Sequence, residues 1–330
     1  MLSRVADAIY WMNRYVERAE NVARFVDVNL HLALDFPEAH SEWEPLIATT
    51  GDASAYRERY GAATRDDVIR FLTFDRDNPN SICMCLSKAR ENARTMREFI
   101  SSEVWEQVNR AYWMVTEASK SGAALDSPHD FFTNVKQASH LFVGTMYLTM
   151  THNEGWHFGR LGRLLERADK TSRILDVKSH MVEPGREDVP TPSDELHWSA
   201  LLRSASAFEM YRKAFGNVVP AKVIEFLLLD DRFPRSVLYC LKKSERSLHA
   251  ITGTQSGRWT NRAERELGRL NAELAYAEMK EVLARGLHRF IDDLQLRMNH
   301  VNDSIAETFF AVAAHDEGRP RTLPPLSRAE

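Results

Sequence analysis

Glutamate and arginine occur together in two matching stretches of the chain. The first runs from Glu17 to Val28 and reads ERAENVARFVDV; the second runs from Glu166 to Val177 and reads ERADKTSRILDV. The two stretches lie 149 positions apart and share six of their twelve residues. A guanidinium holds a carboxylate or a phosphate through two parallel hydrogen bonds. These stretches can therefore form ion pairs inside the protein or bind an anionic ligand.

On a helical wheel, the charged and polar residues of each stretch fall on one side of a helix. At 100° per residue they cover an arc of about 120°. Apolar residues share that arc, including Phe25 in the first copy and Ile174 in the second. This mixture favours a helix face covered by protein. The stripe consists of Arg14, Glu17, Arg18, Asn21 and Arg24 in the first copy, and of Arg163, Glu166, Arg167, Lys170 and Arg173 in the second.

The residues leave three interpretations of this stripe open. The first is an internal ion-pair network, because covered charges are costly unless they are paired and hydrogen-bonded. In its simplest form, Glu17 and Glu166 accept bonds from arginines of the same helix or of the other copy. The second is a solvated charged face, the most common environment of such a stripe. The third is a binding site, and an excess of arginine over glutamate would select a ligand with carboxylate or phosphate groups.

The elements that must position these residues read as helices throughout the chain. Apolar residues at helical spacing predict one long helix from about Ser3 to Leu34. No segment shows the sustained alternation of a strand. Further helices are expected at about residues 42–49, 54–60, 65–74, 78–99, 102–119, 128–150, 261–284 and 287–314.

Other landmarks recur 155 positions apart. The sequence Tyr56-Arg57 with Gly61 matches Tyr211-Arg212 with Gly216, and Pro79 with Ser81 matches Pro234 with Ser236. The change of offset from 149 to 155 implies a net insertion, which we place in the proline- and glycine-containing segment Val182–Ser193.

These patterns predict an all-α helical bundle. It would consist of two internally repeated units of about five or six helices each, related by a pseudo-twofold axis. We expect residues 1–150 to form the first unit and residues 151–314 to form the second, packed on the first as one globule. Residues 315–330 read as a polar tail.

Composition excludes several classes of function. The chain has 43 basic and 47 acidic residues and a net charge of -4, so no basic excess calls for nucleic acid. No apolar run reaches the roughly 18 residues of a membrane-spanning helix, and the N-terminus lacks the pattern of a signal peptide. Three cysteines give no disulfide framework. We therefore expect a cytoplasmic protein that binds neither nucleic acid nor a membrane.

Weaker candidates for chemistry lie outside the stripe. Glu154 and His157 form a Glu-x-x-His element, which di-iron bundles use twice. The corresponding places in the first half hold Val5 and Ala8, so we expect no metal and no cofactor. Among the repeated residues, Cys85 and Cys240 read as buried small side chains and Ser81 and Ser236 as hydroxyls at helix starts. The chain has no glycine-rich phosphate loop.

Two segments carry a resemblance to a known family. They are Tyr10-Trp11 followed by Arg14 to Asn21, and Glu154 to Asp176. The chain resembles the bacterial alpha-E domain family over nearly its whole length, and that family is named for an all-helical fold with a Glu-Arg motif. Its members are typically encoded beside a circularly permuted ATP-grasp ligase and a transglutaminase-like cysteine peptidase. The resemblance implies these two partners in a system that makes or modifies a peptide. It supplies no catalytic residues.

The leading hypothesis is a non-catalytic binding or scaffold partner of those two enzymes. An ATP-grasp enzyme needs β-sheet lobes, which this sequence does not predict, so the chain is not itself the ligase. The rival hypothesis is an enzyme or carrier that binds an anionic carboxylate or acyl phosphate substrate between the two Glu-Arg helices. A third hypothesis is a homo-oligomer formed through exposed helix faces.

Overall fold

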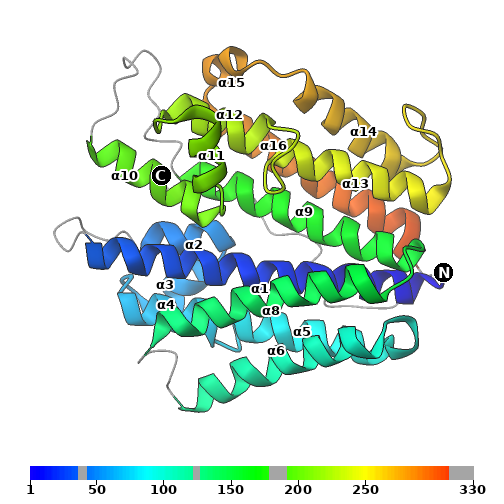
Figure 1. The fold of residues 1–330 in the computed structure, drawn as a ribbon, viewed down its shortest axis with the longest axis horizontal. Helices are drawn as coiled ribbons and strands as arrows, with labels where there is room; N and C mark the ends of the chain where they lie inside the picture. The colour runs from blue at the N-terminus through cyan, green and yellow to red at the C-terminus, as the bar shows by residue number, and fades with distance from the viewer. Residues whose placement is uncertain (36–42, 122–126, 178–191, 312–330) are drawn as a thin grey trace. The chain divides into compact units, whose positions relative to one another are not determined.

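Residues 1–35, 43–121, 127–177 and 192–311 are described by the computed structural model. Within these ranges every regular element is a helix and none is a strand, so the predicted all-α class is confirmed (Figure 1). The expected tail at 315–330 and most of the insertion segment Val182–Ser193 lie outside the described residues. The chain divides into two compact units, Met1–Glu166 and Arg167–Glu330. The predicted boundary at residue 150 stays a prediction.

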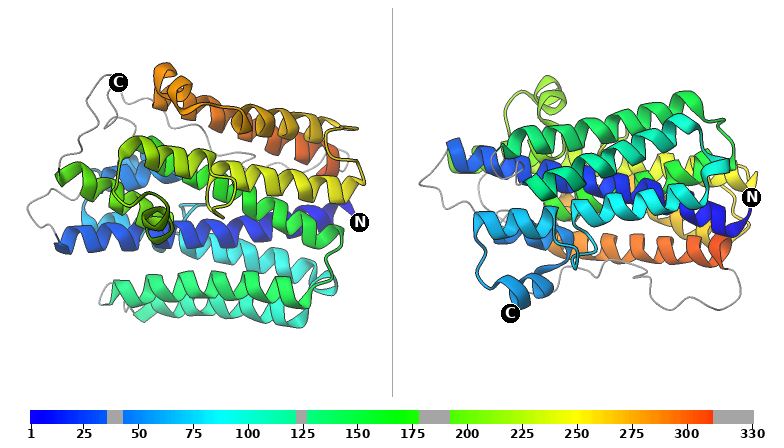
Figure 2. Two further views of the ribbon diagram at one scale, coloured as in Figure 1. Left: turned by 45° about the horizontal axis from the view of Figure 1, so that its top comes forward. Right: turned by 90° about the horizontal axis from the view of Figure 1, so that it is seen from below.

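The first unit is built around α1 (Ser3–Asp35), which buries Ile9, Met12 and Val26 completely or nearly so. Helices α5 and α8 both pack against α1, and α6 packs against α5 and α8, so the four form a bundle (Figure 2). The other bundle helices are α5 (Ile82–Thr95), α6 (Ser102–Ser121) and α8 (Pro128–Thr149). Three shorter helices lie between α1 and α5 in the sequence: α2 (Glu44–Thr50), α3 (Ala53–Tyr60) and α4 (Arg65–Thr73).

The start of α5 shows one confirmed prediction and one error. The Ser81 hydroxyl accepts a hydrogen bond from the Met84 amide at 3.2 Å and donates to the Asp75 carbonyl at 2.7 Å, so it caps the helix as expected. The helix expected from residue 78, however, begins at Ile82, so that Pro79 precedes it. The reason is a turn in which the Asn80 amide donates to the Asn78 side chain at 2.9 Å.

The second unit ends in a group of packed helices, with α14 lying against both α13 and α16. The helix expected over residues 261–284 is interrupted, because the backbone of Glu278 is extended between α14 and α15. A π-helical turn, Ala306–Phe310, follows the last α-helix. The bounds are α10 (Pro192–Ser204), α11 (Phe208–Phe215), α12 (Pro220–Leu229), α13 (Val237–Thr252), α14 (Arg262–Ala275), α15 (Met279–Arg285) and α16 (Leu287–Ile305).

Helix α9 (Glu154–Val177) carries the second Glu-Arg stretch, and its first half belongs to the first unit. Glycines allow that half to approach α1 closely. A Cβ atom at Gly162 would lie 2.4 Å from the backbone oxygen of Tyr10, and one at Gly159 would lie 2.6 Å from the side-chain nitrogen of Asn13. A larger residue at Gly162 would have to displace the backbone of α1, and one at Gly159 would have to displace the side chain of Asn13. The crossing holds α9 so that Glu166, one turn beyond Gly162, lies beside the charged residues of α1.

A buried glutamate–arginine cluster and two aspartate–histidine corners

Glu166 is fully buried and accepts hydrogen bonds from two arginines of α1. The Nε atom of Arg14 lies 2.9 Å from Oε2, the Nε atom of Arg18 lies 2.6 Å from Oε1, and Nη2 of Arg18 lies 3.0 Å from Oε2. Arg18 therefore makes the forked, two-bond contact that its planar group favours. Both arginines are buried, and they bring two positive charges to one negative charge.

A chain of polar contacts extends from this cluster towards α3. Nη1 of Arg18 donates to the side-chain oxygen of Asn80 at 2.6 Å, and the side-chain nitrogen of Asn80 donates to the carboxylate of Asp52 at 2.9 Å. Burial alone would lower the pKa of Arg18, but the charge of Glu166 and its hydrogen bonds raise that pKa above the ordinary value. The guanidinium thus stays charged inside the protein. The guanidinium of Arg14 also lies 4.8 Å from the centre of the Trp11 ring.

The remaining members of the first stripe are buried as well. The side-chain nitrogen of Asn21 donates to the carbonyl oxygen of Glu17 at 2.7 Å and to its carboxylate at 3.1 Å. Arg24 forms an ion pair with Glu20, one helical turn earlier. Every residue of this copy of the stripe therefore has a partner on α1 or on α9.

In the second copy, Lys170 and Arg173 are completely buried, whereas Arg163 and Arg167 are half-buried. Asp169 faces both buried cations, with its Oδ2 atom 3.4 Å from Nζ of Lys170 and 2.9 Å from Nε of Arg173.

The second copy also contacts the loop before α13. Nη1 of Arg167 donates to the carbonyl oxygen of Pro234 at 3.3 Å. The Thr171 hydroxyl donates to the carbonyl oxygen of Arg235 at 2.9 Å. The motif helix is therefore anchored to the segment that ends at Ser236, which caps α13.

The Glu154 and His157 pair is not assembled as a site. The carboxylate of Glu154 accepts a bond from the Met1 amino group at 2.8 Å and is about half exposed. Burial, with help from the charge of Arg160, lowers the pKa of His157. Among the described residues, the groups able to hold a metal include neither side chain. Cys85 and Cys240 are completely buried.

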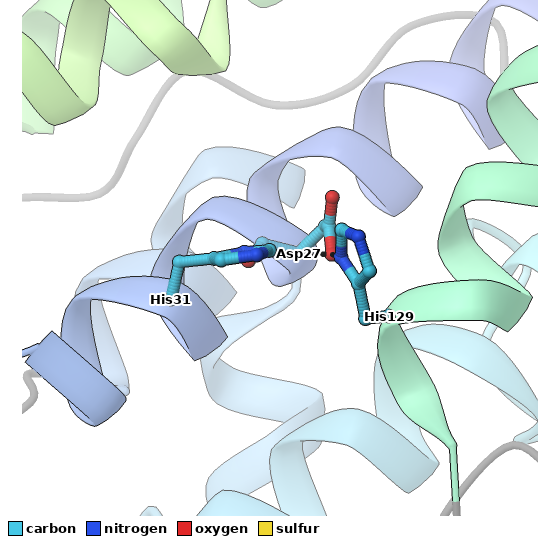
Figure 3. Close-up of side chains that lie close together, drawn as sticks. All are labelled: Asp27, His31 and His129. Carbon is cyan, nitrogen blue, oxygen red and sulfur yellow. Dashed lines mark hydrogen bonds and ion pairs between the residues drawn. The ribbon is translucent and has the colours of Figure 1, made fainter.

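A cluster that the sequence analysis missed lies near the end of α1. Asp27 is nearly buried, with its Oδ1 atom 2.8 Å from Nδ1 of His129 and its Oδ2 atom 2.5 Å from Nζ of Lys136. His31 lies one turn further along α1, with Nδ1 at 3.7 Å from Oδ1 of Asp27. Figure 3 shows the two imidazoles on either side of the carboxylate. We call Asp27, His31, His129 and Lys136 the Asp27 corner.

The second unit has a corner at the matching place. Asp176 occupies the position in its motif that Asp27 occupies in the first copy. Its Oδ1 atom lies 2.6 Å from Nδ1 of His288, and Nε2 of that ring lies 3.4 Å from Asp292. Burial raises the pKa of Asp176, although the bond from His288 opposes this. We call Asp176, His288 and Asp292 the Asp176 corner.

A sequence signal for these corners did exist. Asp27 and Asp176 are among the six identical residues of the motif, and each histidine partner is the second residue of its helix, α8 or α16. The histidines are separated from these aspartates by 102 and 112 residues. Nothing in the local sequence marks those long-range pairs.

Comparison with known proteins identifies the family. A family described as "a predicted alpha-helical domain with a conserved ER motif" (Alpha-E) matches residues 1–310. The relatives found include uncharacterized proteins of Mycobacterium bovis and of two Mycobacterium tuberculosis strains, each 25% identical over 345 residues. The alignments cover 98% of this chain but only 38% of each relative. No solved structure matches the chain. None of its described helices is long and apolar enough to cross a membrane.

Proposed function

The chain belongs to the Alpha-E family, and from that premise we propose that it is a non-catalytic binding or scaffold module. Its partners would be an ATP-grasp peptide or amide ligase and a transglutaminase-like peptidase in a bacterial system, placed in the cytoplasm, that makes or modifies a peptide. The choice of these partners rests on the resemblance of the Glu-Arg segments to the family. The chain spans 38% of the curated relatives named above, which is compatible with a module that works beside other parts.

The observation that carries the non-catalytic role is the pairing of the Glu-Arg residues. Arg14 and Arg18 are buried against Glu166, and Arg24 and Arg173 each pair with a carboxylate one turn away. A group that binds substrate or transfers protons must be reached by the substrate. Charges held in buried pairs instead fix the positions of helices. We therefore propose that the residues of the stripe hold the helices in place and do not bind substrate.

The rival proposal assigns the stripe to an anionic substrate bound between the two Glu-Arg helices. It requires guanidinium groups that can exchange their present partners for a carboxylate or an acyl phosphate. Arg167 is the best placed of them, because it is half-buried and solvent can reach its side chain. Binding of acetyl phosphate that is lost in Arg167→Ala, with folding unchanged, would favour this proposal over the scaffold.

We further propose that the two units arose by internal duplication and are related by a pseudo-twofold axis. Matched local features support this. Tyr56 and Tyr211 are both buried in short helices that end at Gly61 and Gly216, where φ is +74° and +76°. Exposed helix faces would also permit self-association, which light scattering measures directly.

Co-purification tests the scaffold proposal. An ATP-grasp ligase of the kind that the family resemblance implies is expressed with and without this chain, and the complex is captured through a tag on the ligase. We expect the two proteins to elute together and ligase activity to rise when the chain is present. Separate elution, with the same ligase activity in both samples, would overturn the proposal. The Glu154→Gln variant serves as a control for the role of the buried cluster. It removes an exposed charge outside that cluster, so it should elute with the ligase as the natural chain does.

A further inference from the structure

The Asp27 corner combines the ligand types of an open transition-metal site. It brings two imidazoles and one carboxylate together, and one ligand atom from each lies within 4.8 Å of the others. Zinc sites that keep an exchangeable position commonly use three protein ligands of this kind. We propose that Asp27, His31 and His129 bind one divalent transition ion of the Zn²⁺ class, with the fourth position open to solvent or to a ligand from outside.

The distances in the corner suit such an ion. Tetrahedral Zn²⁺ with bonds of about 2.0 Å holds its ligand atoms about 3.3 Å apart. The Nδ1 atoms of His129 and His31 lie 2.8 and 3.7 Å from Oδ1 of Asp27, on either side of that value. The ring centres are 4.5 Å apart and the ring planes nearly perpendicular, at 82°. Each of these two distances is within about 0.5 Å of the tetrahedral value.

Access and orientation support the same assignment. The side chain of Asp27 is 5% exposed, whereas those of His31 and His129 are 50% and 58% exposed. An ion can therefore reach both rings from solvent. The carboxylate itself is held, because Lys136 binds its Oδ2 atom at 2.5 Å. This leaves Oδ1 directed towards the imidazoles and favours binding through one oxygen.

Two features oppose metal binding and set its expected strength. The positive charge of Lys136 repels a cation, and Nδ1 of His31 lies 2.8 Å from the backbone oxygen of Asp27, a hydrogen bond that ligation through this atom would replace. Against both costs stands the gathering of three ligands on two helices, α1 and α8, which reduces the ordering that binding requires. The site is thus partly preorganised.

The Asp176 corner provides an internal contrast. It has one imidazole, and the two nitrogens of that ring face different carboxylates, at 2.6 and 3.4 Å. One ligand atom from each of its three residues also lies within 4.8 Å of the others, so the contrast between the corners is the single imidazole and the second carboxylate. We therefore expect the ion at Asp27 alone, which makes His288 the matched control residue.

Calorimetric titration of the untagged, full-length protein with Zn²⁺ tests the proposal. A histidine tag must be absent, because it would bind Zn²⁺ itself and add to the 12 histidines of the chain. We expect one ion per chain, weakening by more than about 100-fold in His31→Ala and in His129→Ala, and a change of less than about twofold in His288→Ala. Absence of one-to-one binding, equal affinity in all four proteins, or loss only in His288→Ala would overturn it.

A second measurement separates loss of the site from loss of the fold. Zn²⁺ should raise the melting temperature of the natural protein and of His288→Ala but not of the other two variants, because only a bound ion stabilises the folded state. X-ray absorption at the zinc edge should show two imidazole nitrogens among ligands about 2.0 Å from the metal. A shell of oxygen atoms alone would contradict the assignment.

Discussion

Two places on α1, about two and a half turns apart, use charge in different ways. In the middle of the helix, Arg14 and Arg18 are buried against Glu166, whose side chain has no exposed surface. Near the end, Asp27 lies beside two imidazoles that are half exposed. The comparison separates two roles of charge. Buried and paired groups position helices, whereas groups with accessible lone pairs are available to ligands.

The largest expected effect concerns the buried place. Glu166→Gln removes the carboxylate that Arg14 and Arg18 both contact, while the two arginines remain charged and buried. We expect the free energy of unfolding to fall by about 3–5 kcal/mol, measured by urea denaturation. Glu154→Gln, at an exposed site on the same helix, should change it by less than about 0.5 kcal/mol. Equal effects of the two variants would remove the distinction between buried and open charge.

The shape of the arginine group should matter next. Arg18→Lys keeps the charge but loses the forked contact with Glu166 and the bond to Asn80. We expect a loss of about 2 kcal/mol. Arg167→Lys, at a half-buried site where the guanidinium donates to the carbonyl oxygen of Pro234, should cost less than about 1 kcal/mol. Thermal or urea unfolding measures both losses in the free energy of unfolding. A larger loss for Arg167→Lys would show that the second copy carries the tighter network.

The open place should be less important for stability. Asp27→Asn weakens the contact with Lys136 and should lower the free energy of unfolding by about 1–2 kcal/mol. The same variant should abolish the binding of Zn²⁺. A stability loss as large as that of Glu166→Gln would indicate that the Asp27 corner is also architectural.

The smallest effect is a pH dependence at the Asp176 corner. Burial raises the pKa of Asp176, so its protonated form is favoured in the folded state. This contribution to stability is complete below the unfolded pKa and is lost as pH rises through the folded pKa. In a His288→Ala background, the stability of the protein with Asp176, measured relative to the Asp176→Asn variant, should therefore fall as the pH rises above the ordinary pKa of an aspartate. Unfolding curves at several pH values measure it, and a rise would contradict the sign.

Much of the fold follows from local patterns in the sequence. The apolar spacing predicts α1, α6 and α8 to within one or two residues, because each buries a continuous face. Ser81 and Ser236 are recognisable as helix caps from their residue type and their place after a proline. The interruption between α14 and α15 cannot be recognised in this way, since the residues there are compatible with a helix and carry no proline or glycine that would break it.

The sites depend more strongly on contacts that are distant in sequence. The wheel identifies Arg14, Arg18 and Glu166 as one kind of residue, but only the crossing at Gly162 brings them together. His129 and Lys136 have no periodic or motif signal that links them to Asp27. The sequence therefore indicates which charged residues matter on the motif helices and misses the partners supplied by other helices.

The pairing of Arg18 with Glu166 also has a consequence for biosynthesis. The two residues are 148 positions apart. At a synthesis rate of about 5–20 residues per second, roughly 7–30 s pass between their translation. During that interval the arginines of α1 lack the carboxylate that they contact in the finished fold. The first unit can thus reach its final packing only after the ribosome has released the first half of α9, and a fragment that ends at residue 150 would never reach it.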